Sequence, residues 1–208
     1  ASPTKIMKTI DIFKTPLFIC NLDSTRHMAP KLEKLAYQEE KNKSCRNVSN
    51  INGGHQTPFI AVEDEPLYKE LIDTLIPEIL NVVYQYNYVD NTQVQILQCW
   101  ININRKSHLN MPHTHPKCDF AGIYYIKSDE KTPIGFKNPD LLVREEKFKC
   151  KEYNSYNGPV HMYYPKKNDF LMFPAHIEHW VDPNWSDTDR IALAFNVKIT
   201  DENEGYHR

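Results

Sequence analysis

The sequence has no apolar run long enough to cross a membrane as a helix, and no excess of charge of either sign. A helical span needs roughly 18 or more consecutive apolar residues, and none of that length occurs here. The 25 Lys and Arg are spread among 27 Asp and Glu, with a formal net charge of −2. The N-terminal residues ASPTKIMK also lack the apolar core of a signal peptide. We therefore expect a cytoplasmic protein that binds neither a membrane nor nucleic acid.

Cysteine and glycine are both scarce. The cysteines form no CxxC pair and are odd in number, so neither a disulfide framework nor a zinc ribbon is predicted. Two of the six glycines, Gly53 and Gly54, stand in a polar stretch, and we expect residues 49–59 to form a loop over a site. The five cysteines are Cys20, Cys45, Cys99, Cys118 and Cys150.

Before residue 90 the sequence predicts two helices and a short β region. Pro30–Lys41 opens with a first-turn proline and is rich in good helix formers. Glu65–Tyr86 carries leucine and isoleucine at three- and four-residue spacing, with a kink or restart expected at Pro77. Thr9–Cys20 predicts one or two strands at a sheet edge, which leaves both a monomer and a homodimer open.

Beyond residue 90, short alternations of apolar and polar residues predict strands. In the longest, Val94–Asn104, strict alternation places Val94 and Ile96 on one face with Gln98 and Asn102. These two polar side chains either orient a substrate or cosubstrate or pair within the sheet. Residues 137–159 are polar and irregular, which suggests a lid. Further strands are predicted at Phe120–Lys127, Thr132–Phe136, His161–Pro165, Asp169–Phe173, Trp180–Val181 and Ile191–Ile199.

Seven or eight strands with packed helices indicate a mainly β fold, a double-sheet barrel or jelly roll. A chain of 208 residues most simply forms one domain. We expect a single domain over residues 1–208, in which residues 1–90 support a β core formed by residues 91–200.

Histidines gather in two segments. His113 and His115 stand two residues apart just before an apolar stretch, so in an extended chain both point to the same side. A later segment, FPAHIEHWV, supplies His176 and His179. An isolated HxH is usually a polar loop, but three or four imidazoles from two strand ends can form an open metal site. Arg190 begins a later strand, where a guanidinium could bind a carboxylate in a bidentate manner.

Seven segments of the chain form a recognisable series: SNINGGHQ (Ser49–Gln56), WININ (Trp100–Asn104), HTHP (His113–Pro116), AGIYYI (Ala121–Ile126), FKNP (Phe136–Pro139), FPAHIEHWV (Phe173–Val181) and RIALAFN (Arg190–Asn196). Together these segments resemble the Fe(II)/2-oxoglutarate-dependent oxygenases, and among them a small bacterial and phage branch related to the prolyl hydroxylases. The resemblance covers most of the chain, with the segments in the same order.

The resemblance implies a double-stranded β-helix (jelly roll, cupin-like) with Fe(II) at its open end. It implies 2-oxoglutarate as cosubstrate and O2 as oxidant, and hydroxylation of a C–H bond in a small molecule, an amino acid or a peptide. Carried over to this sequence, His113 and His179 match iron ligands. Arg190 matches the residue that pairs with the 2-oxoglutarate carboxylate, and Tyr125 matches a tyrosine that contacts the cosubstrate.

One position departs from the usual His-x-Asp/Glu…His pattern, because His115 stands where the acidic ligand is expected. The third ligand is then His115, a water molecule or another carboxylate, of which Asp119 is the nearest in sequence. A neutral imidazole in place of a carboxylate adds one net positive charge and favours anionic co-ligands. We prefer the set His113, His115 and His179.

Two other functions stay open at this point. One is a three-histidine iron dioxygenase that does not use 2-oxoglutarate, and the other is a jelly-roll metal- or ligand-binding module without turnover. The sequence does not identify the primary substrate, although residues 49–59 and 138–160 are expected to select it.

Overall fold

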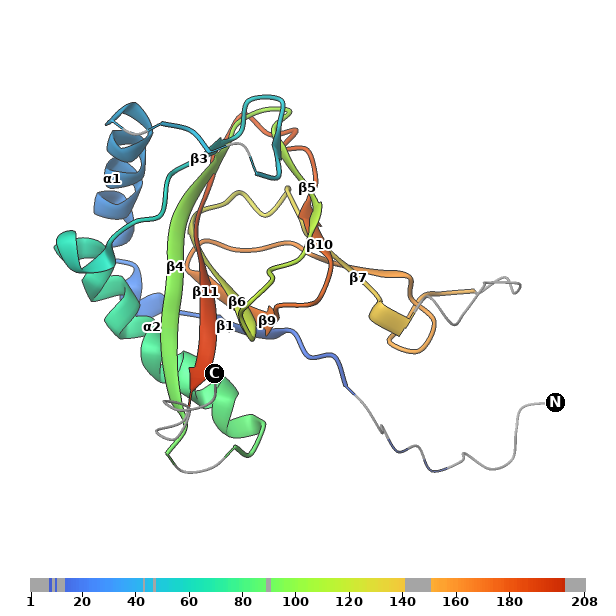
Figure 1. The fold of residues 1–208 in the computed structure, drawn as a ribbon. Helices are drawn as coiled ribbons and strands as arrows, with labels where there is room; N and C mark the ends of the chain where they lie inside the picture. The colour runs from blue at the N-terminus through green and yellow to red at the C-terminus, as the bar shows by residue number, and fades with distance from the viewer. Residues whose placement is uncertain are drawn as a thin grey trace.

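The computed structural model describes residues 8, 10, 14–42, 44–46, 48–88, 91–140 and 151–200 (Figure 1). Its helices are α1 (Ala29–Asn42) and α2 (Pro66–Gln85), with single 3₁₀ turns at η1 (Asp23–Thr25) and η2 (Val62–Asp64). The strands are β1 (Phe18–Asn21), β2 (Asn50–Ile51), β3 (His55–Gln56), β4 (Gln93–Asn104), β5 (Leu109–His113), β6 (Phe120–Lys127), β7 (Ile134–Lys137), β8 (Val160–Tyr163), β9 (Asp169–Pro174), β10 (His179–Val181) and β11 (Arg190–Thr200).

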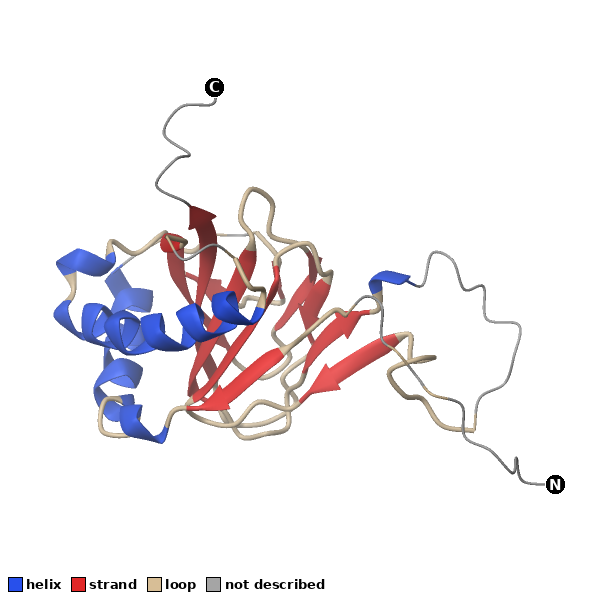
Figure 2. Cartoon of the chain, turned by 90° about the horizontal axis from the view of Figure 1, so that it is seen from below, coloured by secondary structure: helices blue, strands red, loops and turns tan. Residues whose placement is uncertain are grey.

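The strands form two antiparallel sheets, and both helices lie on the outer side of the larger one (Figures 1 and 2). The six-stranded sheet has the order β1-β9-β6-β11-β4-β3, and the five-stranded sheet has the order β2-β5-β10-β7-β8. One buried cluster joins Leu32, Leu71 and Leu75 of the helices to Ile101 and Leu193 of the larger sheet. A second cluster, with Ile123, Phe136, Phe173 and Ala192, fills the space between the sheets. The predicted mainly β fold with packed helices is confirmed.

Both predicted helices are present, but the expected restart at Pro77 is wrong. Helix α2 continues through Pro77, which lies on its exposed face. The apolar side chains Leu71, Leu75 and Ile79 are fully buried on the opposite face. Burial of this face outweighs the one backbone hydrogen bond that a proline removes. Pro66 occupies the first turn, and the Glu65 side chain accepts a hydrogen bond from the Leu67 amide, 3.2 Å away.

The alternation along β4 is interrupted by a bulge that the sequence does not reveal. Asn196 of β11 pairs with Gln98, whereas Val197 pairs with Ile96, so Leu97 is an extra residue in the ladder. Leu97 is 41% exposed, and Ile96 packs against the cluster beneath the helices. The expectation that Val94 and Ile96 share a face with Gln98 and Asn102 is therefore wrong.

The described residues contain eleven strands rather than seven or eight. The additional ones include β2 and β3, two residues each, within the predicted loop, and β5, which leads into the HTHP segment. Among the described residues of the predicted Thr9–Cys20, the strand begins at Phe18, and it lies at a sheet edge as predicted. Residues 9 and 11–13 of that prediction lie outside the described residues. Residues 151–159 contain only bends and turns, and residues 141–150 of the expected lid lie outside the described residues.

The described cysteines are free thiols, namely Cys20, Cys45, Cys99 and Cys118. Cys150 lies outside the described residues. Among the helices described, none combines the length and the apolar character needed to span a membrane.

Candidate metal centre

The two histidine segments meet where β5 and β10 pair in the smaller sheet. His113 is the last residue of β5 and His179 is the first residue of β10, and the two are direct partners across the ladder. His115 follows two residues after β5, with its backbone amide bonded to the Ala175 carbonyl at 2.9 Å. One ligand atom from each of these three histidines lies within 4.8 Å of the other two. The structure thus brings together the three preferred residues.

Hydrogen bonds fix the orientation of all three imidazole rings. The Nδ1–H groups of His113 and His179 donate to the carbonyl oxygens of Met111 and Ile177, at 2.7 and 2.9 Å. His115 Nδ1 lies 2.6 Å from the amide oxygen of Asn196 and donates to it. With each proton on Nδ1, every ring keeps a lone pair on Nε2, the tautomer in which a histidine binds a metal through Nε2.

The spacing of these nitrogens fits a metal ion. The Nε2 atoms of His115 and His179 are 3.2 Å apart. Two nitrogen ligands at about 2.1 Å from one metal, with octahedral or tetrahedral bond angles, lie about 3.0 to 3.4 Å from each other. Two lone pairs facing each other at this distance repel, unless a cation lies between them. The residues present therefore fit a divalent ion with three nitrogen donors.

Burial keeps these histidines neutral. It lowers the pKa of His113 and of His115 and lowers the pKa of His179 to about 3, the neighbouring His113 adding to the effect at His179. His179 is only 3% exposed. Because an imidazole must lose its proton to bind a metal through Nε2, the three rings are ready to bind at neutral pH.

The lowered pKa values predict that the metal-free protein loses stability on acidification. Unfolded histidine takes up a proton near pH 6.5, whereas folded His179 does so only near pH 3. Within this interval the unfolded state binds more protons, so the free energy of unfolding falls as pH falls, by up to about 1.4 kcal/mol per pH unit from His179. Urea denaturation at pH 7.5, 6.5 and 5.5 measures the slope. His179→Gln is expected to reduce the slope of the free energy of unfolding against pH. A slope identical to that of the wild type would contradict the lowered pKa of His179.

Asn196 and Trp100 orient His115, and the sequence reasoning gave neither residue this role. The Asn196 side-chain amide donates to Gln98 Oε1 at 2.8 Å, so Asn196 is itself held in place while it accepts from His115. The Trp100 ring stacks on His115, with centroids 5.7 Å apart. A signal for Asn196 was present, since alternation from Arg190 along β11 places residues 190, 192, 194 and 196 on one face.

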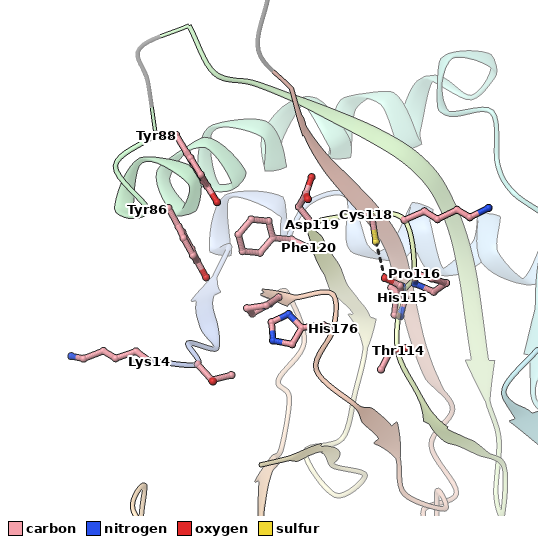
Figure 3. Close-up of a pocket in the computed structure, with 13 residues that line it drawn as sticks. Lys14, Tyr86, Tyr88, Thr114, His115, Pro116, Cys118, Asp119, Phe120 and His176 are labelled. Atoms are coloured by element: carbon pink, nitrogen blue, oxygen red, sulfur yellow. Dashed lines mark hydrogen bonds between the residues drawn. The ribbon is translucent and has the colours of Figure 1, made fainter. Parts of the chain in front are cut away.

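The structure separates Asp119 and His176 from this cluster. Asp119 Oδ2 accepts a hydrogen bond from the Ile199 amide at 2.7 Å and pairs with Lys198 Nζ at 3.2 Å. Its carboxylate is thus engaged at the far end of β11. His176 is exposed and lines a second cavity, of about 590 Å³, whose lining includes His115 but neither His113 nor His179 (Figure 3).

The three histidines and Arg190 line one cavity of about 400 Å³, which we call the barrel cavity. Arg190 is 3% exposed, and its Nη2 donates to the Tyr125 hydroxyl at 3.1 Å. Its Nε has no hydrogen-bond partner, and no described carboxylate forms an ion pair with it. Tyr125 is fully buried, and burial raises its pKa. The barrel cavity therefore holds a buried cation with an unsatisfied donor.

Gln98 and Asn102 also line the barrel cavity, so they share a strand face as alternation predicted. Gln98 is already bonded to Asn196. Asn102 differs, because its side-chain oxygen is buried and has no partner. A buried acceptor without a partner costs free energy unless a ligand or water satisfies it.

Comparison with known proteins agrees with this arrangement. Residues 98–196 match the family model described as "Putative 2OG-Fe(II) oxygenase". No curated protein matches the sequence.

Solved structures similar to this chain include a Pseudomonas putida prolyl-4-hydroxylase, with 9% identity, a TM-score of 0.62, and 88% of this chain and 93% of that chain covered. HygX from Streptomyces hygroscopicus, solved with nickel and 2-oxoglutarate bound, has 12% identity and a TM-score of 0.60 over 88% and 83% of the two chains. The alpha-ketoglutarate-dependent epimerase SnoN has 9% identity and a TM-score of 0.63 over 92% and 83%. These likenesses confirm the predicted double-stranded β-helix fold.

Proposed function

We propose, from the match of residues 98–196 to the 2OG-Fe(II) oxygenase family model, that the chain hydroxylates a C–H bond of a small molecule, an amino acid or a peptide. Fe(II) with 2-oxoglutarate and O2 supplies the two-electron oxidation, with release of succinate and CO2. The observation that carries the proposal is the convergence on one cavity of three imidazole lone pairs and a buried arginine that has no counter-ion among the described residues.

His113, His115 and His179 would hold the iron. The ion pair of Asp119 with Lys198 and its bond to the Ile199 amide support His115, rather than this carboxylate, as the third ligand. Three neutral ligands leave both charges of Fe(II) uncompensated, so the site attracts an anion more strongly than a site with a carboxylate ligand does. The dianion 2-oxoglutarate meets this requirement.

Arg190 would bind the distal carboxylate of 2-oxoglutarate. A buried guanidinium without a counter-ion is costly, and a carboxylate that accepts from its free Nε removes that cost. Tyr125 would act through Arg190, by holding the guanidinium at the cavity wall. Asn102 is proposed as a second contact to the cosubstrate through its side-chain NH2 group, which can donate to a carboxylate oxygen; its unpaired oxygen can only accept, and would need a donor from water or the primary substrate. Gln98 would act through Asn196 on the orientation of His115.

One alternative has a specific observation in its favour. A three-histidine iron dioxygenase that does not use 2-oxoglutarate would also lack a carboxylate ligand, as the described cluster does. Arg190 favours an enzyme that uses 2-oxoglutarate, because the distal carboxylate of 2-oxoglutarate would pair with the buried guanidinium. The alternative dioxygenase offers this guanidinium no such anion. A binding module without turnover predicts no oxygen consumption. The monomer or homodimer and the cytoplasmic location remain expectations, the dimer supported by β1 at the sheet edge.

The test is turnover by the purified protein loaded anaerobically with Fe(II). We expect slow conversion of 2-oxoglutarate to succinate on addition of O2, measured by chromatography and by an oxygen electrode, with omission of iron as the control. Oxygen consumption that does not depend on 2-oxoglutarate would favour the alternative dioxygenase. Absence of oxygen consumption by the iron-loaded protein would leave only the binding module.

A further inference from the structure

Among the described residues that line the barrel cavity, every side chain charged at neutral pH is basic. Arg46, Lys117 and Arg190 line it, and none of the described lining residues is an Asp or a Glu, although acidic residues outnumber basic ones in the chain. Under the proposed function, 2-oxoglutarate accounts for Arg190, which is buried. Arg46 is half-buried and Lys117 is exposed, so these two cations lie at the solvent end of the cavity. There they are available to bind another anion.

Arg46 is preorganised to bind a carboxylate. Its guanidinium carbon lies 4.1 Å from the centroid of the Phe59 ring, and no described residue forms a hydrogen bond or ion pair with its side chain. Stacking covers one face of a guanidinium and leaves its edge N–H groups free for two parallel bonds to a carboxylate. The backbone there is also fixed, because the Arg46 amide donates to the Gln56 carbonyl at 2.8 Å.

A row of aromatic rings runs from Arg46 to the metal centre. The centroids of Phe59 and Trp100 are 6.1 Å apart, and Trp100 stacks on His115. Phe59 is 45% exposed, while Trp100 is buried deeper in the wall. An apolar or flat group that lies on Trp100 is therefore beside His115, while a carboxylate on the same molecule can reach Arg46 at the cavity mouth.

We propose that the primary substrate is a carboxylate-bearing molecule with an apolar or aromatic body. Arg46 binds the carboxylate, and Phe59 and Trp100 form the surface on which the body lies. That the bound molecule is a substrate rests on the proposed function. Binding of a carboxylate by Arg46 can be tested without turnover.

The binding test uses matched pairs of an acid and its amide. The probes are N-acetylated phenylalanine, tyrosine and leucine, each as the free acid and as the carboxamide, titrated into the metal-free protein by calorimetry. For at least one pair we expect the acid to bind about tenfold or more tightly than the amide, as loss of a charge-assisted hydrogen bond predicts. Equal binding, or no binding, across all three pairs overturns the inference.

Three variants locate the carboxylate. Arg46→Gln is expected to remove the difference in affinity between the acid and the amide. Arg190→Gln should retain it, and Arg26→Gln should retain it too, since Arg26 is an exposed arginine paired with Asp23. A difference that disappears in Arg190→Gln but persists in Arg46→Gln overturns the inference, because the acid then occupies the proposed cosubstrate site.

Turnover separates failure of this inference from failure of the proposed function. Consumption of 2-oxoglutarate by the iron-loaded wild type, without any preference for acids over amides, overturns the Arg46 inference alone. A preference that depends on Arg46, without any consumption of 2-oxoglutarate, overturns the proposed function and supports Arg46 as a carboxylate-binding residue.

Discussion

His179→Ala is expected to abolish stoichiometric iron binding and to reduce 2-oxoglutarate turnover by more than about a hundredfold. Loss of an outer-shell partner of a metal ligand typically costs about 10- to 100-fold, and loss of the ligand itself should cost more. His179 is the most deeply buried of the three imidazoles, and its Nε2 lies 3.2 Å from that of His115. Metal analysis after anaerobic loading and dialysis measures occupancy, and succinate formation measures turnover.

His176→Ala is the matched control for this experiment. His176 belongs to the same segment, three residues earlier, but it is exposed and outside the cluster. This variant should bind one iron and keep its turnover. Thermal denaturation of both metal-free variants establishes that they fold. Full iron occupancy in His179→Ala would rule out His179 as a ligand.

Arg190→Ala is expected to weaken 2-oxoglutarate binding by about 1.5 to 3 kcal/mol, which is a rise in Kd of about 10- to 150-fold. The reason is loss of the charge-assisted pair between the buried guanidinium and the distal carboxylate. Iron binding should be unchanged, because Arg190 is not one of the clustered ligands. Titration of 2-oxoglutarate into the anaerobic iron-loaded protein, followed by calorimetry, measures the change.

Two further variants check this interpretation. Arg190→Met removes the charge but fills more of the buried space than alanine, so it should show the same loss of affinity if the charge is responsible. Tyr125→Phe removes only the hydroxyl that accepts from Arg190. This variant should weaken the free energy of 2-oxoglutarate binding by less than the Arg190 variants do, by about 0.5 to 1.5 kcal/mol, the usual contribution of one hydrogen bond. Unchanged affinity in both Arg190 variants would refute the anchoring role.

The sequence predicts the chemistry of the site better than its surroundings. His113 and His179 stand at strand ends, where spacing and alternation carry information, and the structure places them opposite each other. The same alternation could have predicted the position of Asn196, since it shares a strand face with Arg190. The bulge at Leu97 could not be predicted, because an extra residue in a ladder depends on the partner strand rather than on local sequence.

Tertiary contacts also overrode local signals elsewhere. Pro77 predicts an interruption, yet the buried face of α2 maintains one helix. Strand β5 contains a proline, and its sequence LNMPH lacks alternation, so its pairing with β2 and β10 was not predicted. Arg46 and Phe59 come from a stretch without periodicity, and only the fold brings them to the cavity that holds the histidines.

The stretch that carries Arg46 and Phe59 joins the two sheets through very short strands, β2 beside β5 and β3 beside β4. It lies outside residues 98–196, the part that matches the family model and contains all three clustered histidines. The residue proposed to bind the substrate carboxylate would thus lie outside the part that carries the metal ligands, whereas Trp100, beside His115, lies within it. Substitutions at Arg46 and Phe59 would then alter which substrates bind without touching any of the clustered histidines.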